Sequence, residues 1–207
     1  MVTVNTLHKL SKDEISLLRQ LVGKSLTTII CSGVDLNSGQ NYYDFIDTIN
    51  LKFQGDKGYV SISALSDETS FGDDFIKIFI RLEKDPVGIK RHDQGGLQHP
   101  FVNLDVYPEF TVKRIEVYGD SYVCHSENIE TKRYWKIEID NPGKPITENI
   151  ETENVIVFYS DNSRLLIRPY GAIPWIQATF DNNFIENSLL TKDREGKTIT
   201  KLKHELR

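Results

Sequence analysis

The sequence of 207 residues has few cysteines, no long apolar run and no visible secretory signal. Two cysteines, Cys31 and Cys124, are too few for a disulfide framework, and their strand-like surroundings predict buried free thiols. No apolar run approaches the roughly 18–20 residues of a membrane-spanning helix. The N-terminus lacks the basic start and apolar stretch of a signal peptide. We therefore expect a cytoplasmic protein that does not enter a membrane.

An excess of positive charge is also missing. The formal net charge is −5, which argues against a protein that coats nucleic acid or anionic lipid, because such a protein needs a basic face. The basic residues are also unevenly placed. Residues 188–207 hold six Lys/Arg against three Asp/Glu, which leaves 19 basic and 27 acidic residues, a formal charge of −8, in the rest of the chain. The partner expected from this charge is a protein with a basic surface.

Motifs of the common enzyme classes are absent. The sequence has no HExxH or CxxC metal motif, no GxSxG nucleophile elbow and no GxxxxGK phosphate loop. Cys124 and His125 are adjacent, and adjacent residues of a strand point to opposite faces, so they are poorly placed to form a catalytic pair. We expect no cofactor and lean toward a protein without catalytic activity.

Two stretches of similar pattern are present at a constant offset of 105 residues. Residues 51–64 and 156–169 align without a gap, and both show apolar residues at period two on either side of a polar turn. Each predicts a β-hairpin. Three of the fourteen aligned positions are identical, so chance similarity remains an alternative to internal duplication.

The clearest local signal is a helix start. Ser11 and Glu14 form a capping-box pattern, and Leu10 is placed to pack on Ile15 as a hydrophobic staple. Apolar residues then recur at helical spacing, and Gly23 is suited to a left-handed C-terminal cap. An amphipathic helix is predicted over residues 12–22.

The remaining apolar segments predict a mainly β fold (α+β minor): two similar antiparallel β-meanders packed into one body, with an N-terminal amphipathic helix. The tail is predicted as a short helix over 199–206 or as a frayed end. The predicted strands are 26–31, 42–46, 75–82, 110–117, 119–124, 134–139 and 175–180. The predicted organisation is a helix and first meander at 1–85, a connecting loop at 86–108, a second meander at 109–187 and a basic C-terminal tail at 188–207.

Aromatic residues beside charges supply the candidate binding residues. Tyr42 and Tyr43 lie next to Asp44, and Tyr134 and Trp135 lie among basic residues. Tyrosine and tryptophan give a large contact area at a low entropic cost, which is typical of recognition surfaces. Core packing is the alternative, although only one of two adjacent residues of a strand can face inward.

The predicted connecting loop carries the nearest set of metal-ligand types, His92, Asp93 and His99. Imidazole and carboxylate together suit zinc or a non-haem metal. The spacing of the two histidines matches no tight ligand pair, and a solvated surface loop is the competing interpretation.

Two hypotheses follow. The first is a non-catalytic cytoplasmic protein-binding module, of the general character of a bacterial or phage inhibitor or a toxin-neutralising immunity protein, with an acidic, aromatic-bearing face. The alternative is a small-ligand-binding protein or metal-dependent enzyme whose site lies at the cleft between the two halves.

Overall fold

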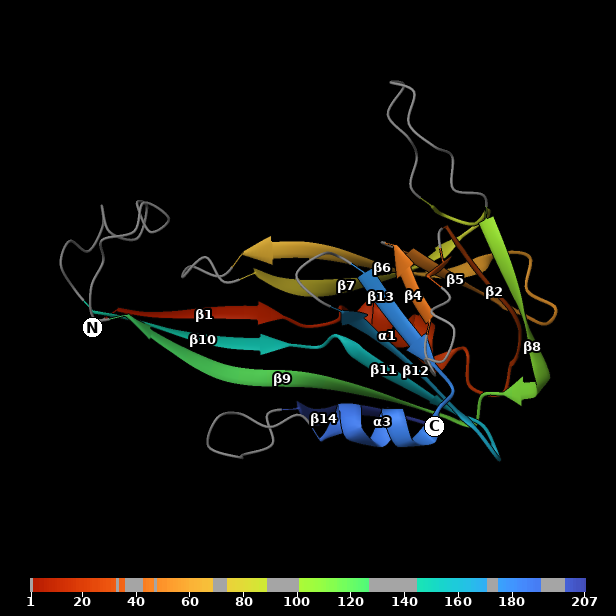
Figure 1. Ribbon diagram of the computed structural model, residues 1–207. Coiled ribbons are helices and arrows are strands. Elements are labelled where there is room, and N and C mark those ends of the chain that lie inside the picture. Colours follow the sequence, from red (N-terminus) through yellow and green to blue (C-terminus); the bar gives the residue numbers. More distant parts are fainter. Residues whose placement is uncertain are drawn as a thin grey trace, which may run out of the picture.

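The computed structural model describes residues 2–32, 34–35, 43–46, 48–68, 74–88, 101–126, 145–170, 175–190 and 200–207. Within these residues the chain is mainly β, with two helices (Figure 1). The elements are β1 (Val2–His8), α1 (Lys12–Arg19), β2 (Ser25–Ser32), β3 (Val34–Asp35), β4 (Tyr43–Ile46), β5 (Thr48–Phe53), β6 (Tyr59–Glu68), β7 (Asp74–Glu83), β8 (Phe101–Thr111), β9 (Arg114–Ser126), β10 (Ile146–Thr152), β11 (Val155–Tyr159), β12 (Arg164–Tyr170), β13 (Trp175–Thr179), α3 (Asn182–Leu189) and β14 (Thr200–Leu206).

The strands form two sheets. The five-stranded sheet has the order β7-β6-β5-β2-β8. The nine-stranded sheet has the order β1-β10-β9-β11-β12-β13-β4-β3, and β14 pairs with β9 beside this path. Neighbouring strands are antiparallel except for β1 and β10, which are parallel. The mainly β prediction with antiparallel sheets is therefore confirmed.

The strands β2, β5, β6 and β7 are neighbours in one sheet, and β9, β11, β12 and β13 are neighbours in the other. Neither set is consecutive in sequence, because β3 and β4 follow β2 and β10 follows β9. The two hairpins of the sequence pattern lie in different sheets and differ in register. Leu51 pairs with Val60, whereas Ile156 pairs with Ile167, two residues further along than the ungapped alignment implies. A shift of two keeps every side chain on its face. Internal duplication stays a prediction.

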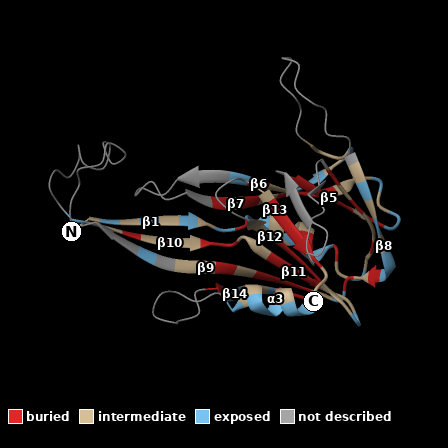
Figure 2. Cartoon of the chain, in the orientation of Figure 1, coloured by how far each residue is buried: buried red, intermediate tan, exposed pale blue. Residues whose placement is uncertain are grey.

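One apolar core joins the two sheets. It contains the inward residues of both hairpins, among them Leu51, Ile62, Ile156 and Ile167, none of which is exposed to solvent. Figure 2 shows the buried residues concentrated where the sheets lie over each other. A hydrophobic face of a sheet must be covered to be stable, and here each sheet covers the other.

Helix α1 begins as the sequence predicts. Ser11 Oγ accepts a hydrogen bond from the Glu14 amide at 3.2 Å, and Glu14 Oε2 accepts one from the Ser11 amide at 2.8 Å, which completes the capping box. Gly23 has φ +87°, the left-handed conformation expected after the helix. The helix is preceded by strand β1, which the sequence analysis did not predict.

Three further predictions are corrected. Residues 101–108 of the predicted connecting loop belong to β8. The last part of the tail is a strand and not a helix or a frayed end. Residues Thr200–Leu206 form β14, which pairs with β9, and Leu206 is buried. The sequence predicts separate strands at 110–117 and 119–124. In the structure the break lies at residues 112–113, between β8 and β9, and β9 runs without interruption from Arg114 to Ser126.

Helix α3 is a second element that the sequence analysis missed. Asp181 caps it by accepting a hydrogen bond from the Phe184 amide at 2.8 Å. Ile185 packs with Val157 and Leu166 in a second, smaller apolar cluster. Neither helix has the length and the apolar character needed to cross a membrane, as far as the described residues go.

Candidate functional site

Strand β8 leaves its partner strand over four residues. Leu26 of β2 pairs with Phe110, and Thr28 pairs with Asp105, so residues 106–109 of β8 lie opposite Thr27 alone. Such an insertion bends a strand away from the ladder. Pro108 lies in this segment and has no amide hydrogen to donate. The segment also carries Tyr107, whose side chain is 95% exposed.

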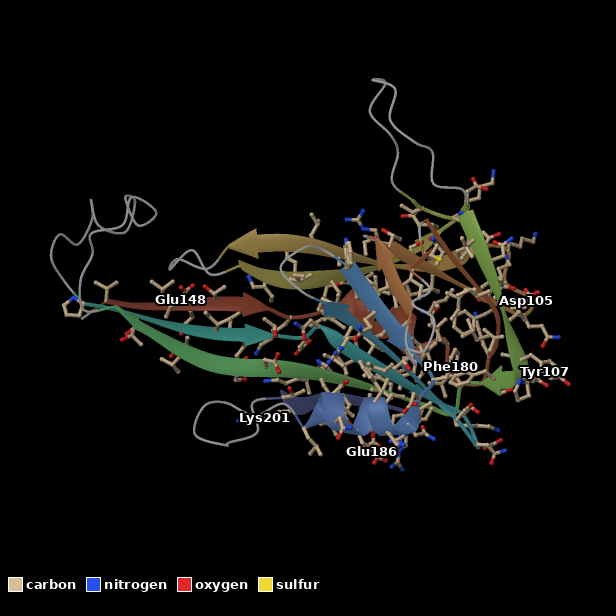
Figure 3. All side chains as sticks on the ribbon, viewed as in Figure 1. Asp105, Tyr107, Glu148, Phe180, Glu186 and Lys201 are labelled. Carbon is tan, nitrogen blue, oxygen red and sulfur yellow. The ribbon has the colours of Figure 1, made fainter. Side chains whose placement is uncertain are left out.

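A cleft of about 590 Å³ lies beside this insertion, and we call it the β8 cleft. One side is β8, and the opposite side is the turn between β11 and β12 at residues 160–163. The cleft therefore lies between an edge of the five-stranded sheet and a turn of the nine-stranded sheet. Figure 3 shows Asp105 and Tyr107 along β8 at one side of the molecule, with Phe180 toward the body.

Apolar side chains line the inner part of the β8 cleft. Phe110 and Phe180 meet edge to face, with ring centroids 5.7 Å apart, and Ile29 lies beside them in the lining. Leu104 and Val106 pack against the core but remain partly exposed. The apolar surface of the core thus continues into the cleft, where a bound apolar group would bury it further.

The charged residues that line the β8 cleft are all acidic: Asp105, Glu109 and Asp161. Glu109 accepts hydrogen bonds from Ser25 Oγ at 2.7 Å and from Thr111 Oγ1 at 3.3 Å, which orient its carboxylate. No lysine, arginine or histidine is among the lining residues that the structure describes.

A lysine outside the cleft contacts one of these carboxylates. Lys113 Nζ lies 3.4 Å from Asp161 Oδ2, with 53% and 72% of the two side chains exposed. Ion pairs this exposed contribute about 0–1 kcal/mol, so an incoming cation can replace Lys113. The β8 cleft is therefore suited to a group that is apolar on one side and positively charged on the other.

Most of the residues predicted from the sequence lie outside the described residues: Tyr42, Tyr134, Trp135, His92, Asp93 and His99. Tyr43 and Asp44 lie on β4, where they pair with Ala178 and Gln177 of β13, and their side chains are outside the described set. No group of three or more metal-ligating side chains occurs within the described ranges.

The cleft is not predicted from the sequence, because residues 101–108 fall in the predicted connecting loop. The alternation of Val102, Leu104 and Val106 is the strand pattern that could have identified β8. Pro108, together with Gly95 and Gly96 further upstream, favoured a loop over this strand pattern. Asp161 lies in the polar turn of the hairpin predicted over residues 156–169, and no motif links it to β8.

A second polar cluster lies on the outer face of the nine-stranded sheet. The carboxylate of the buried residue Glu116 accepts hydrogen bonds from the hydroxyl groups of Tyr118, at 2.6 Å, and Tyr159. Burial, followed by the bond to Glu116, raises the pKa of both phenols. The Arg114 guanidinium lies over the Tyr159 ring at 4.1 Å. The two phenols are hydrogen-bonded to the carboxylate, whereas the buried Arg114 Nε has no hydrogen-bond partner and lies 3.4 Å from Glu116 Oε1. Both tyrosines pack against the apolar cluster of α3, which gives this polar cluster a structural role.

The thiol of Cys31 is free and buried, as predicted for this residue. Burial raises its pKa to about 12, which makes it a poor nucleophile at neutral pH. Cys124 lies on β9 with a side chain outside the described set.

Comparison with known proteins gives no match: no family model, no curated protein and no solved structure is similar to this chain.

Proposed function

We propose that this protein is a non-catalytic, cytoplasmic protein-binding module that holds a basic, partly apolar segment of another protein in the β8 cleft. The observation that carries the proposal is the combination of an apolar lining with three carboxylates and no lining cation. Opposite charges steer the encounter and select the partner, whereas apolar burial supplies most of the affinity. An inhibitor or immunity-type protein that occupies a basic surface of its target works in this way.

Tyr107 supports a role in recognition. A fully exposed tyrosine on a bulged edge strand has no packing role, and tyrosine adds a large contact area when a partner covers it. Its place beside Asp105 and Glu109 puts an aromatic ring and two carboxylates within five consecutive residues. We therefore propose an acidic and aromatic face on β8, and the face predicted from Tyr42, Tyr43, Asp44, Tyr134 and Trp135 stays a prediction.

A small cationic ligand is a second candidate for the same cleft. Its volume of about 590 Å³ falls within the range of roughly 300–1,000 Å³ that is usual for small-molecule sites. Residues of both sheets contribute to its lining. Titration with spermidine separates the two proposals, because a small-molecule site is saturated by the free polyamine and a peptide site prefers the longer segment.

The test uses a cleft variant, Asp105→Asn, Glu109→Gln and Asp161→Asn together, which removes three charges and nearly preserves shape. A displayed library of random dodecapeptides is selected on the wild-type protein. We expect the selected peptides to combine Lys or Arg with apolar residues and to bind the cleft variant about tenfold more weakly or worse. Affinity for the wild-type protein should fall as salt is raised.

A matched control variant removes three carboxylates elsewhere, Asp85→Asn, Glu186→Gln and Glu205→Gln, and has the same net charge as the cleft variant. None of these residues lines the β8 cleft, and Glu186 lies on α3, away from β8 (Figure 3). We expect it to bind the selected peptides like the wild type. Equal losses in the two variants, or selected peptides without basic residues, would refute the proposal.

A further inference from the structure

The two edges of the five-stranded sheet differ in what lies along them. At β7, Glu14 Oε1 accepts a hydrogen bond from the Ile80 amide at 2.8 Å, and Asn154 Nδ2 donates one to the Ile76 carbonyl at 3.4 Å. Side chains from α1 and from the link between β10 and β11 thus occupy backbone groups that another strand could otherwise use. Natural sheets protect their edges in this way.

The other edge is β8, which pairs with β2 and with no other strand that the structure describes. From Phe101 to Asp105 its register with β2 is regular, and the insertion at 106–109 ends this regular stretch. A strand paired on one side presents unpaired backbone N–H and C=O groups on the other. Among the described residues, the straight part of β8 is therefore a short edge without a second partner strand, and it ends at the β8 cleft.

The two faces of this edge have different chemistry. Val102 and Leu104 are partly buried on the face that packs against the core, whereas Asn103 and Asp105 are exposed on the opposite face. A strand added to β8 would share these faces. Its inward side chains would extend the apolar contact of Val102 and Leu104, and its outward side chains would lie beside Asp105.

We propose that the segment held at the β8 cleft binds as an added antiparallel or parallel β-strand along residues 102–105, with apolar and basic residues in alternation. This inference rests on the proposed function and states how the partner is held: backbone hydrogen bonds to β8 supply affinity that does not depend on sequence. The alternating side chains supply selectivity through the apolar face and the carboxylates. Charge complementarity with Asp105, Glu109 and Asp161 determines the choice of a basic partner.

The probe is a fluorescein-labelled peptide of alternating lysine and valine, three of each, with both ends blocked. One control peptide carries N-methyl groups on alternate residues, which removes the amide hydrogens of one edge without changing the side chains. A second control replaces each lysine with glutamate. Binding to the full chain is measured by fluorescence anisotropy, and hydrogen exchange with mass spectrometry locates the contact.

We expect saturable binding of the lysine–valine peptide, with N-methylation on the pairing edge weakening it by about tenfold or more, since several backbone hydrogen bonds are lost. Exchange should slow in residues 102–105 and stay unchanged in β7. The glutamate peptide should bind more weakly than the lysine peptide. Absence of saturable binding, equal binding of the N-methylated peptide, or protection away from β8 would each overturn the added strand.

The outcomes also separate this inference from the proposed function. Binding that depends on the three carboxylates but is insensitive to N-methylation supports the acidic cleft and overturns the added strand. Binding that protects residues 102–105 but is the same in the cleft variant supports the added strand and overturns recognition by charge.

Discussion

Replacing Asn50 with alanine should destabilise the protein more than any single surface substitution. Asn50 lies on β5 at the centre of the five-stranded sheet, on the face opposite the core residues Ile49 and Leu51, and it is not exposed. Its Nδ2 donates to the carbonyls of Ile30, at 3.1 Å, and Val87, at 2.8 Å. Its side chain therefore fastens the chain after β7 to the sheet.

The acceptor side of Asn50 is equally occupied. Oδ1 accepts hydrogen bonds from Ser61 Oγ at 2.6 Å and from the Val87 amide at 2.9 Å. At a net contribution of about 1 kcal/mol for each bond, Asn50→Ala should lower the free energy of unfolding by about 3–4 kcal/mol. That is a large share of a total of roughly 5–15 kcal/mol. Ser61→Ala removes one of the four bonds and should lower it by about 1 kcal/mol.

Urea denaturation followed by circular dichroism measures the difference. With an m-value of about 2–3 kcal/mol/M, Asn50→Ala should lower the midpoint by roughly 1–2 M without changing m. The Val87 amide should also exchange faster in hydrogen-exchange experiments, because it loses its acceptor. A loss no larger than that of Ser61→Ala would refute the reasoning, since it would mean that the bonds to Val87 contribute nothing.

Three other substitutions or treatments test features described above. Gly119→Ala would place Cβ 1.7 Å from the Thr152 carbonyl oxygen, so we expect loss of folded protein, seen as a much lower midpoint of thermal unfolding. Glu14→Ala removes both the capping box and the bond to β7, and should cost about 1–2 kcal/mol in urea denaturation; a loss too small to measure would contradict both roles. The Cys31 thiol should resist iodoacetamide at pH 8 until the chain unfolds, as mass spectrometry of the alkylated peptide would show. Because folding raises the pKa of this thiol from 9.0 to about 12, its contribution to stability is complete below pH 9 and is lost as the pH rises through this range.

The sequence predicted the features that depend on residues close together in the chain. The capping box of Ser11 and Glu14 and the left-handed Gly23 are encoded within a few residues, and the structure has both. Asp181, followed by Ile185 at helical spacing, is a local signal of the same kind for α3. Signals within a few residues are thus sufficient to predict where a helix begins and ends.

Features that depend on distant residues could not be predicted. Strand β1 pairs with β10, which is about two thirds of the chain away in sequence, and β14 pairs with β9. The sequences of β1 and β14 carry no pattern that indicates which strand each pairs with. The β8 cleft likewise depends on residues that are far apart in the sequence. Its carboxylates come from β8 and from the turn after β11, and only the packing of the two sheets brings Asp161 near Asp105 and Glu109.

The distribution of the first strands between the sheets has a consequence for how the chain folds. Residues of β1 pair with β10, and Ile46 of β4 pairs with Trp175 of β13, although β2, between them in sequence, belongs to the other sheet. Contacts over such long separations are closed late, because the entropy of a long loop must be lost first. The five-stranded sheet can be completed once Thr111 has been synthesised, but the nine-stranded sheet needs β1 and β4 together with strands from β9 onward, and one core joins the two sheets. The protein should fold slowly and as one cooperative unit, and its halves expressed separately should aggregate.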